Sequence, residues 1–300
     1  MPGQCALLSP LEYRRNLCLK YKSEGSYKPL ANQVRGSKTV QQARSDDRWL
    51  IAVDVDRVQS YIFESARLPE IVGASELLQA IEQQAKKLLE EQCGQENVVA
   101  AGGSLTAVMY GPEEKAASVA EQAAALWEQR TLACTASATY VAWPPGVDYS
   151  EARAELAHRL RRAKQSKRHL PFLPTFVYAD RCQSCDLRPA ALVGHEGRRL
   201  CWPCQIKTEH FREAIRPRYH EKDAGKQEAL ELDDIAKRCE QNKLGVIRFD
   251  GDGIGSIVET FTGISELQAF ARHLDECVKE AIQDCLRKLR AHSLPHRHLY

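Results

Sequence analysis

Four cysteines in two closely spaced pairs constrain this sequence more than any other feature. Cys182 and Cys185 form the first pair, and fifteen residues separate it from the second pair, Cys201 and Cys204. Two short pairs match the spacing with which four thiolates enclose a tetrahedral zinc ion. Four sulfur ligands leave no open position for water, so the pattern predicts a structural zinc ion rather than a catalytic one. Unmetallated or redox-active cysteines are the alternative.

Length and composition describe an ordinary soluble chain. Its 300 residues suffice for about two average domains, and 43% are hydrophobic and 27% charged. A net charge of +2 gives no overall attraction to nucleic acid, so binding to nucleic acid would need local patches of positive charge. The first residues lack an apolar signal region, and no later stretch reaches the roughly 18 apolar residues of a membrane span. The other cysteines are scattered, as in a reducing compartment. We expect a cytoplasmic protein without membrane contact.

Residues 1–47 are polar and basic and predict an extension, and the first folded half follows. Trp49 to Val53 is a continuous apolar run, typical of a strand covered on both faces, and it ends at Asp54 and Asp56. The later elements follow from apolar periodicity and a glycine turn. They are helices at 57–66, 74–89, 113–131 and 150–165, a hairpin over 98–110 around Gly102–Gly103, and a strand at 134–142. This order is that of a ferredoxin-like domain with one extra helix.

A second half begins near residue 244. Residues 244–249 again form an apolar strand, which again ends in paired acids, Asp250 and Asp252. A short helix and a long helix follow, and the long helix carries an apolar stripe from Leu267 to Leu289. Cys277 and Cys285 fall on that stripe, so we expect both in a core.

The two halves also suggest an internal repeat. The acids at 54 and 56 match those at 250 and 252 at a shift of 196 residues, and Gly73 to Leu77 matches Gly263 to Leu267 at a shift of 190. Both matches occur in the same order, and the second is expected just before the long helix in each half. Each string is common by itself, but the shared order favours a duplication.

The second acidic turn is the candidate catalytic feature. Asp250 and Asp252 alternate with Gly251 and Gly253 at a strand-to-helix turn, and Gly255 follows. Carboxylates of this kind suit Mg²⁺, and glycines let backbone amides approach phosphates at the helix start. The chemistry indicated is phosphoryl or nucleotidyl transfer. Capping or solvated turn residues are the alternative. In the first half no glycines follow the acids, so that copy is expected to be structural or nucleotide-sensing.

Together these motifs make the chain resemble the large subunit of type III CRISPR effector complexes. The matching segments are Asp54 to Leu78, Cys182 to Cys204 and Val246 to Gly255. The resemblance implies an α+β chain with two ferredoxin-like palm domains, similar to those of polymerases and nucleotide cyclases, separated by a four-cysteine zinc ribbon. It also implies antiviral defence by synthesis of cyclic oligoadenylate from ATP when target RNA is bound. The implied partners are ATP, other type III effector subunits, CRISPR RNA and target RNA.

The resemblance also assigns roles to residues. Asp250 and Asp252 would be catalytic and would hold Mg²⁺ or Mn²⁺ with ATP. The residues implied to contact the nucleotide are Gly251, Gly253, Ile254, Gly255, Ser256, Gly73, Ala74 and Ser75. The expected organisation is an extension at 1–47, a degenerate first palm at 48–175, the ribbon and a helical connector at 176–243, and the start of an incomplete second palm at 244–300.

Three departures qualify the resemblance. The family's second palm carries a Gly-Gly-Asp-Asp hairpin that completes its metal site, and this sequence has reached Tyr300 about where that hairpin is expected. The equivalent first turn, Gly102 to Leu105, has no acids, which fits an inactive first palm. The His-Asp dipeptide of the family's nuclease domain and the family's helical C-terminal domain are also absent from the sequence. Enzymatic activity therefore stays open.

A cluster of basic residues closes the first half, and rival functions remain. Its members are Arg159, Arg161, Arg162, Lys164, Lys167 and Arg168. They could contact RNA phosphates, although a solvated helix end is the simpler interpretation. The main alternative to an enzyme is an inactive nucleotide-binding scaffold of a ribonucleoprotein complex. A plain zinc-ribbon nucleic-acid module leaves the repeat unexplained, and a diguanylate-type cyclase lacks its signature string.

Overall fold

The computed structural model describes residues 47–167, 180–194, 197–215, 231–237, 241–243 and 253–291. The chain divides into two compact units, Met1–Gln42 and Ala43–Tyr300, and all described residues belong to the second. The expected extension, apart from Asp47, lies outside the described residues. The expected strand at 244–249 and the acidic turn at 250–252 lie outside them too. None of the described helices is long and apolar enough to span a bilayer.

A four-stranded antiparallel sheet forms the first domain. The central strand β1 (Arg48–Val55) pairs with β3 (Ser104–Tyr110) on one side and with β4 (Ala136–Ala142) on the other. The strand β2 (Val98–Ala101) pairs with β3, so the strand order is β2-β3-β1-β4. With its intervening helices the domain follows the β-α-β-β-α-β order of a ferredoxin-like fold, as the sequence predicted.

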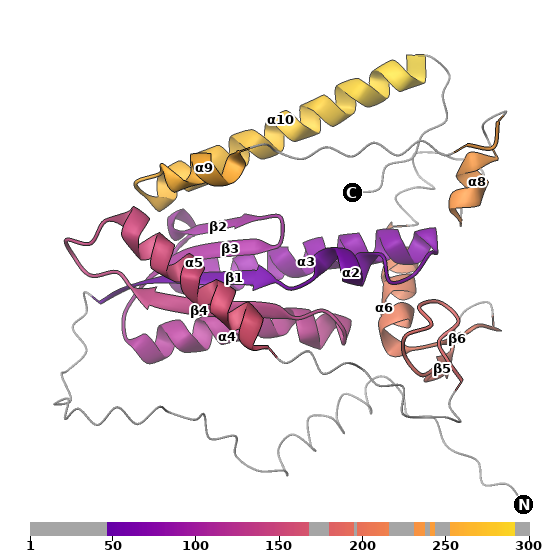
Figure 1. Ribbon diagram of the computed structural model, residues 1–300, viewed down its shortest axis with the longest axis horizontal. Coiled ribbons are helices and arrows are strands. Elements are labelled where there is room, and N and C mark those ends of the chain that lie inside the picture. Colours follow the sequence, from indigo (N-terminus) through magenta and orange to yellow (C-terminus); the bar gives the residue numbers. More distant parts are fainter. Residues whose placement is uncertain are drawn as a thin grey trace, which may run out of the picture. The chain divides into compact units, whose positions relative to one another are not determined.

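Helices cover both faces of this sheet (Figure 1). The helices α3 (Leu68–Cys93) and α4 (Glu113–Thr131) pack on one face, and α5 (Tyr149–Ser166) packs on the other. A short helix, α2 (Val58–Ile62), connects β1 to α3, and a single 3-10 turn, η1 (Gln95–Asn97), precedes β2. Successive residues of β1 point to opposite faces, so its continuous apolar run supplies both cores. The buried residues of β1 are Leu50, Ile51, Ala52, Val53 and Val55.

A two-residue turn joins β2 to β3. Gly102 and Gly103 have φ values of 63° and 86°, the left-handed conformation that a tight hairpin turn of this hand requires. The backbone N–H of Gly103 donates to Glu82 of α3, and its carbonyl accepts the N–H of Val55 at 3.0 Å. The glycine turn is thereby attached to the end of β1.

The cysteine-bearing segment packs against α3. It contains a two-stranded ribbon, β5 (Leu192–Val193) and β6 (Arg199–Leu200), followed by α6 (Trp202–His210) and a π-helical turn, η3 (Phe211–Ile215). Close contact with α6 requires a glycine at position 73. A Cβ there would lie 2.1 Å from the carbonyl oxygen of Lys207, which is far inside van der Waals contact.

Two further helices belong to the expected second half. The helix α9 (Ile254–Glu259) and the long helix α10 (Ile264–Ala291) confirm the predicted short and long helices, and another short helix, α8 (Leu232–Ala236), lies before them. Near its start α10 contacts the first domain, where Gln268 donates to the carbonyl of Val98 at 2.8 Å.

The expectation that Cys277 and Cys285 lie in a core is wrong. Both are exposed, and the apolar stripe around them is only half-buried. Among the described residues, the early part of α10 packs on the first domain through Ile264 and Gln268, and no described layer covers the later stripe. Periodicity identified the apolar face correctly, but it does not show whether a partner element covers it.

The second part of the repeat also needs correction. Gly263 lies directly before α10, whereas Gly73 lies in the second turn of α3, which begins at Leu68. Pro69 occupies the first turn of α3, where proline is favoured because its missing N–H has no helical partner. The residues before Ala74 are helical because they pack on η3 instead of on the sheet.

Candidate metal centre, strand-end acids and groove

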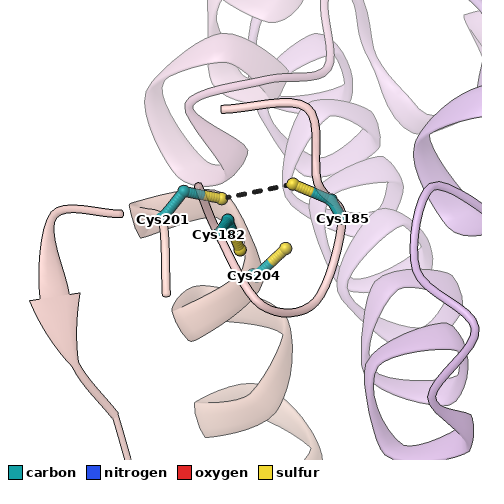
Figure 2. A group of neighbouring side chains, drawn as sticks. All are labelled: Cys182, Cys185, Cys201 and Cys204. Atoms are coloured by element: carbon teal, nitrogen blue, oxygen red, sulfur yellow. Dashed lines mark hydrogen bonds between the residues drawn. The ribbon is translucent and has the colours of Figure 1, made fainter. Parts of the chain in front are cut away.

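The four cysteines come together as a compact cluster (Figure 2). Cys182 and Cys185 lie on the loop that the bridge between Arg181 and Pro189 closes, while Cys201 and Cys204 lie at the start of α6. All four sulfurs are within 4.8 Å of one another and all four side chains are buried. Cys185 Sγ lies 3.8 Å from Cys201 Sγ. A tetrahedral ion with metal–sulfur bonds of about 2.3 Å requires sulfur separations of roughly 3.8 Å, so the cluster fits a metal ion such as zinc.

The electrostatics of the cluster also favour a cation. Hydrogen bonds from the other three thiols lower the pKa of Cys182, and the pKa of Cys185 is lowered to about 6. Hydrogen bonds to the neighbouring thiols raise the pKa of Cys201 and of Cys204. Like charges in one buried site repel one another, so a positive ion among the four sulfurs would stabilise their thiolate forms.

The acids at the end of β1 are paired with lysines. Asp56 is 8% exposed, and its carboxylate accepts hydrogen bonds from Lys167 Nζ at 2.7 Å, Thr135 Oγ1 at 2.9 Å and Ser137 Oγ at 2.9 Å. Lys164 donates to Asp54 and lies 3.9 Å from Asp56. Both lysines come from the end of α5.

The pairing determines the charge state of the strand end. Burial by itself would raise the pKa of Asp56, but hydrogen bonds from Lys167, Thr135 and Ser137 outweigh it, so the pKa lies below its usual value of 3.8. Lys164 and Lys167 also place two ammonium groups against the carboxylates, and their positive charge opposes binding of a divalent cation there. The sequence placed Lys164 and Lys167 in a basic cluster that could contact RNA. In the structure their ammonium groups bind Asp54 and Asp56 instead.

A groove of about 850 Å³ lies beside the end of β1. Its walls come from α3, from β2 with the Gly102–Gly103 turn, from Val55 and Val58, and from α10. Glu82 lines the groove, and burial raises the pKa of its carboxyl, although the Gly103 N–H opposes that shift. Arg272 of α10 also lines the groove, as do Lys86 and Lys279. Half of the residues that line the groove are polar or charged, and the other half are apolar or glycine.

The predicted nucleotide residues fall in three places. Gly73 and Ala74 are buried in α3, with Gly73 against α6, while Ser75 lines the groove. Gly253, with φ of 70°, precedes α9, and Ile254, Gly255 and Ser256 form its first turn. Within the described part of the chain the groove lining includes no residue of α9. Asp250, Gly251 and Asp252 lie outside the described residues, so their roles remain predictions.

The sequence placed Lys164 and Lys167 in the basic cluster but did not predict that they pair with Asp54 and Asp56. Lys164 lies in the last turn of α5, and Lys167 directly follows the end of that helix. Nothing in the sequence links them to Asp54 and Asp56, which lie more than a hundred residues earlier.

Comparison with known proteins gives a partial likeness. No protein-family model matches the chain, and no curated protein shows significant similarity. The solved structures similar to it include the apo Csm1–Csm4 cassette, with 19% identity, a TM-score of 0.35 and coverage of 43% of this chain and 20% of that one. The Csm1–Csm4 subcomplex of the type III-A CRISPR-Csm interference complex matches at 21% identity and a TM-score of 0.35, with 43% and 20% covered. The Csm1–Csm4 cassette in complex with cA4 matches at 20% identity and 0.34, with 40% and 19% covered. The matches span about a fifth of those chains.

Proposed function

We propose that this chain is a nucleotide-binding protein of the type III CRISPR effector large-subunit type. In this proposal the ferredoxin-like domain is a non-catalytic palm, the four cysteines hold a structural zinc ion, and the segment from residue 244 begins a second palm. In its complete form the protein binds ATP and makes cyclic oligoadenylate when the complex recognises target RNA. The ordered sequence motifs support the assignment, and the groove beside the end of β1 carries the nucleotide-binding part.

The groove has the size and position that nucleotide binding needs. Its volume of about 850 Å³ lies within the range of roughly 300–1,000 Å³ typical of small-molecule sites. Val55, Val58 and the glycine turn form one wall, so the groove adjoins the strand end where the acidic motif begins. Arg272 would supply a positive group for phosphates, and of the predicted nucleotide residues that the structure describes, Ser75 lies on the lining.

The ion pairs with Lys164 and Lys167 support different roles for the two acidic turns, a structural role for the first and metal binding for the second. Asp54 and Asp56 are already neutralised by Lys164 and Lys167, so they are poor metal ligands. Mg²⁺ would then be held by the carboxylates of Asp250 and Asp252, an all-oxygen donor set that suits this ion. When bound there, the ion would neutralise charge on the triphosphate.

Isothermal titration of ATP with Mg²⁺ into the purified chain tests the proposed groove. We expect the unsubstituted protein to bind, and Arg272→Ala to weaken binding about tenfold, because a hydrogen bond to a charged group contributes roughly 1.5–3 kcal/mol. Arg287→Ala is the matched control, since Arg287 is an arginine of α10 that does not line the groove. No ATP binding, or equal affinity for all three proteins, would contradict the proposal.

An inactive nucleotide-binding scaffold is the second candidate. The ion pairs of the first domain favour it, because within the described residues Lys164 and Lys167 offset the charge of the strand-end carboxylates and so oppose metal binding there. This candidate predicts ATP binding without turnover, together with RNA-dependent association with partner subunits.

A further inference from the structure

A chain of buried charges runs from the cysteine cluster into the first domain. Arg188 Nη1 lies 3.9 Å from Cys185 Sγ, and Arg188 Nη2 donates to Glu64 Oε2 at 2.9 Å. The other carboxylate oxygen of Glu64 accepts a hydrogen bond from Lys207 Nζ at 2.7 Å. Lys207 also donates to the carbonyl of Tyr61, and its ammonium lies 4.0 Å from the centre of that ring. The cysteine cluster is therefore connected to the end of α2 through the side chains of Arg188, Glu64 and Lys207.

The depth of burial makes this arrangement unusual. The side chains of Lys207, Glu64 and Arg188 are 0%, 5% and 20% exposed. Charged groups lose much of their hydration at such depth, so each needs a well-placed partner. Lys207 by itself compensates the charge of the Glu64 carboxylate. Arg188 therefore adds a positive charge that Glu64 does not require.

The surplus positive charge faces a site that becomes negative on metal binding. A divalent ion with four thiolates carries a net charge of about −2, and the cluster is buried. Arg188, Glu64 and Lys207 together carry a net charge of about +1. The guanidinium of Arg188 is the part of this group that faces Cys185. Glu64 holds the guanidinium by one oxygen and is itself held by Lys207, which leaves Arg188 little freedom to turn away.

We infer that Arg188 and Glu64 are positioning residues of the zinc site, with Arg188 compensating the charge of the thiolates and Glu64 fixing Arg188 from the first domain. This role goes beyond nucleotide binding and rests only on the proposed zinc ion. It makes metal retention depend on Glu64, a residue that contacts none of the four cysteines.

The rate of zinc release tests this inference in the full chain. Protein purified without chelator is mixed with a colorimetric zinc chelator under native conditions, and the release is followed over time. We expect Arg188→Gln to release zinc roughly tenfold faster, as substitutions around metal ligands usually do. Glu64→Gln, which keeps the shape of the side chain, is expected to accelerate release in the same direction. Arg181→Gln is the matched control, because Arg181 precedes the first cysteine pair and forms an exposed ion pair with Asp186.

The possible outcomes separate this inference from the other assignments. Release at the unsubstituted rate from both Arg188→Gln and Glu64→Gln overturns the positioning role and leaves the zinc site standing. Unsubstituted protein that contains no zinc overturns both. Circular dichroism of each variant shows whether the fold is retained, and if Arg188→Gln does not fold, Glu64→Gln and Arg188→Lys decide the outcome. Lysine keeps the charge without the two-pronged geometry, so we expect an intermediate rate.

Discussion

Breaking the contact between Asp56 and Lys167 should show how far the first domain depends on its own lysines. The perturbation is a double-mutant cycle of Asp56→Asn, Lys167→Met and the combined variant. Asp56 is 8% exposed and accepts the Lys167 ammonium at 2.7 Å, so the carboxylate keeps little contact with water. Asparagine retains the shape and removes the charge, and its single oxygen can still accept from Thr135 or Ser137 while its NH2 group replaces the other acceptor.

The expected coupling between the two residues is about 1.5 kcal/mol. Hydrogen bonds to charged groups contribute roughly 1.5–3 kcal/mol, and the side chain of Lys167 is 33% exposed, so solvent screening places this pair at the low end. Urea denaturation followed by tryptophan fluorescence supplies the free energy of unfolding of each variant. Lys167→Met should cost more than Asp56→Asn, because it leaves a buried carboxylate with only weak compensation.

A matched surface pair gives the control for this cycle. Glu155 and Arg159 also belong to α5, but their side chains are 49% and 51% exposed, so we expect no measurable coupling between them. A coupling between Asp56 and Lys167 below about 0.5 kcal/mol, which is the usual limit of additivity, would refute the reasoning.

Two other predictions concern packing and pH. Gly73→Ala should destabilise the protein by about 1–3 kcal/mol, because its Cβ would lie 2.1 Å from the carbonyl oxygen of Lys207. Gly255→Ala is the control and should not destabilise it, because a Cβ at that position has no atom within 4 Å. Equal unfolding midpoints for the two variants would contradict the close contact between α3 and α6. Because the pKa of Asp56 is lowered from 3.8, its contribution is present above that pH and is lost as the pH falls through the folded-state value. The stability difference between unsubstituted protein and Asp56→Asn should therefore shrink in acid, and a difference that stays constant from pH 6 to about pH 2.5 would contradict this sign.

Local patterns predicted the first domain closely. Glu113 to Thr131 formed the helix that its alanine-rich stripe indicated, and the glycine pair at 102–103 formed the predicted hairpin turn. The two cysteine pairs met as their spacing required. These features depend on interactions between residues close in sequence or on a ligand geometry that short spacings satisfy.

Contacts between distant segments were not predictable from the sequence. Glu64 and Lys207 are 143 residues apart, and neither belongs to a pattern that marks a buried ion pair. The beginning of α3 was missed because Leu68 and Val72 pack on η3 instead of on the sheet, which breaks the single apolar stripe. Cys277 was misplaced because an apolar stripe records a preference for burial and not the presence of a covering element.

Formation of cyclic oligoadenylate from ATP by the complete effector complex tests the central claim most directly. The complex is incubated with target RNA, ATP and Mg²⁺, and Asp250→Asn is compared with Asp54→Asn, which removes a carboxylate paired with Lys164 in the first domain. The account predicts that Asp250→Asn abolishes product and that Asp54→Asn retains it. Equal product from the unsubstituted complex and Asp250→Asn, or loss of product only with Asp54→Asn, would contradict the account.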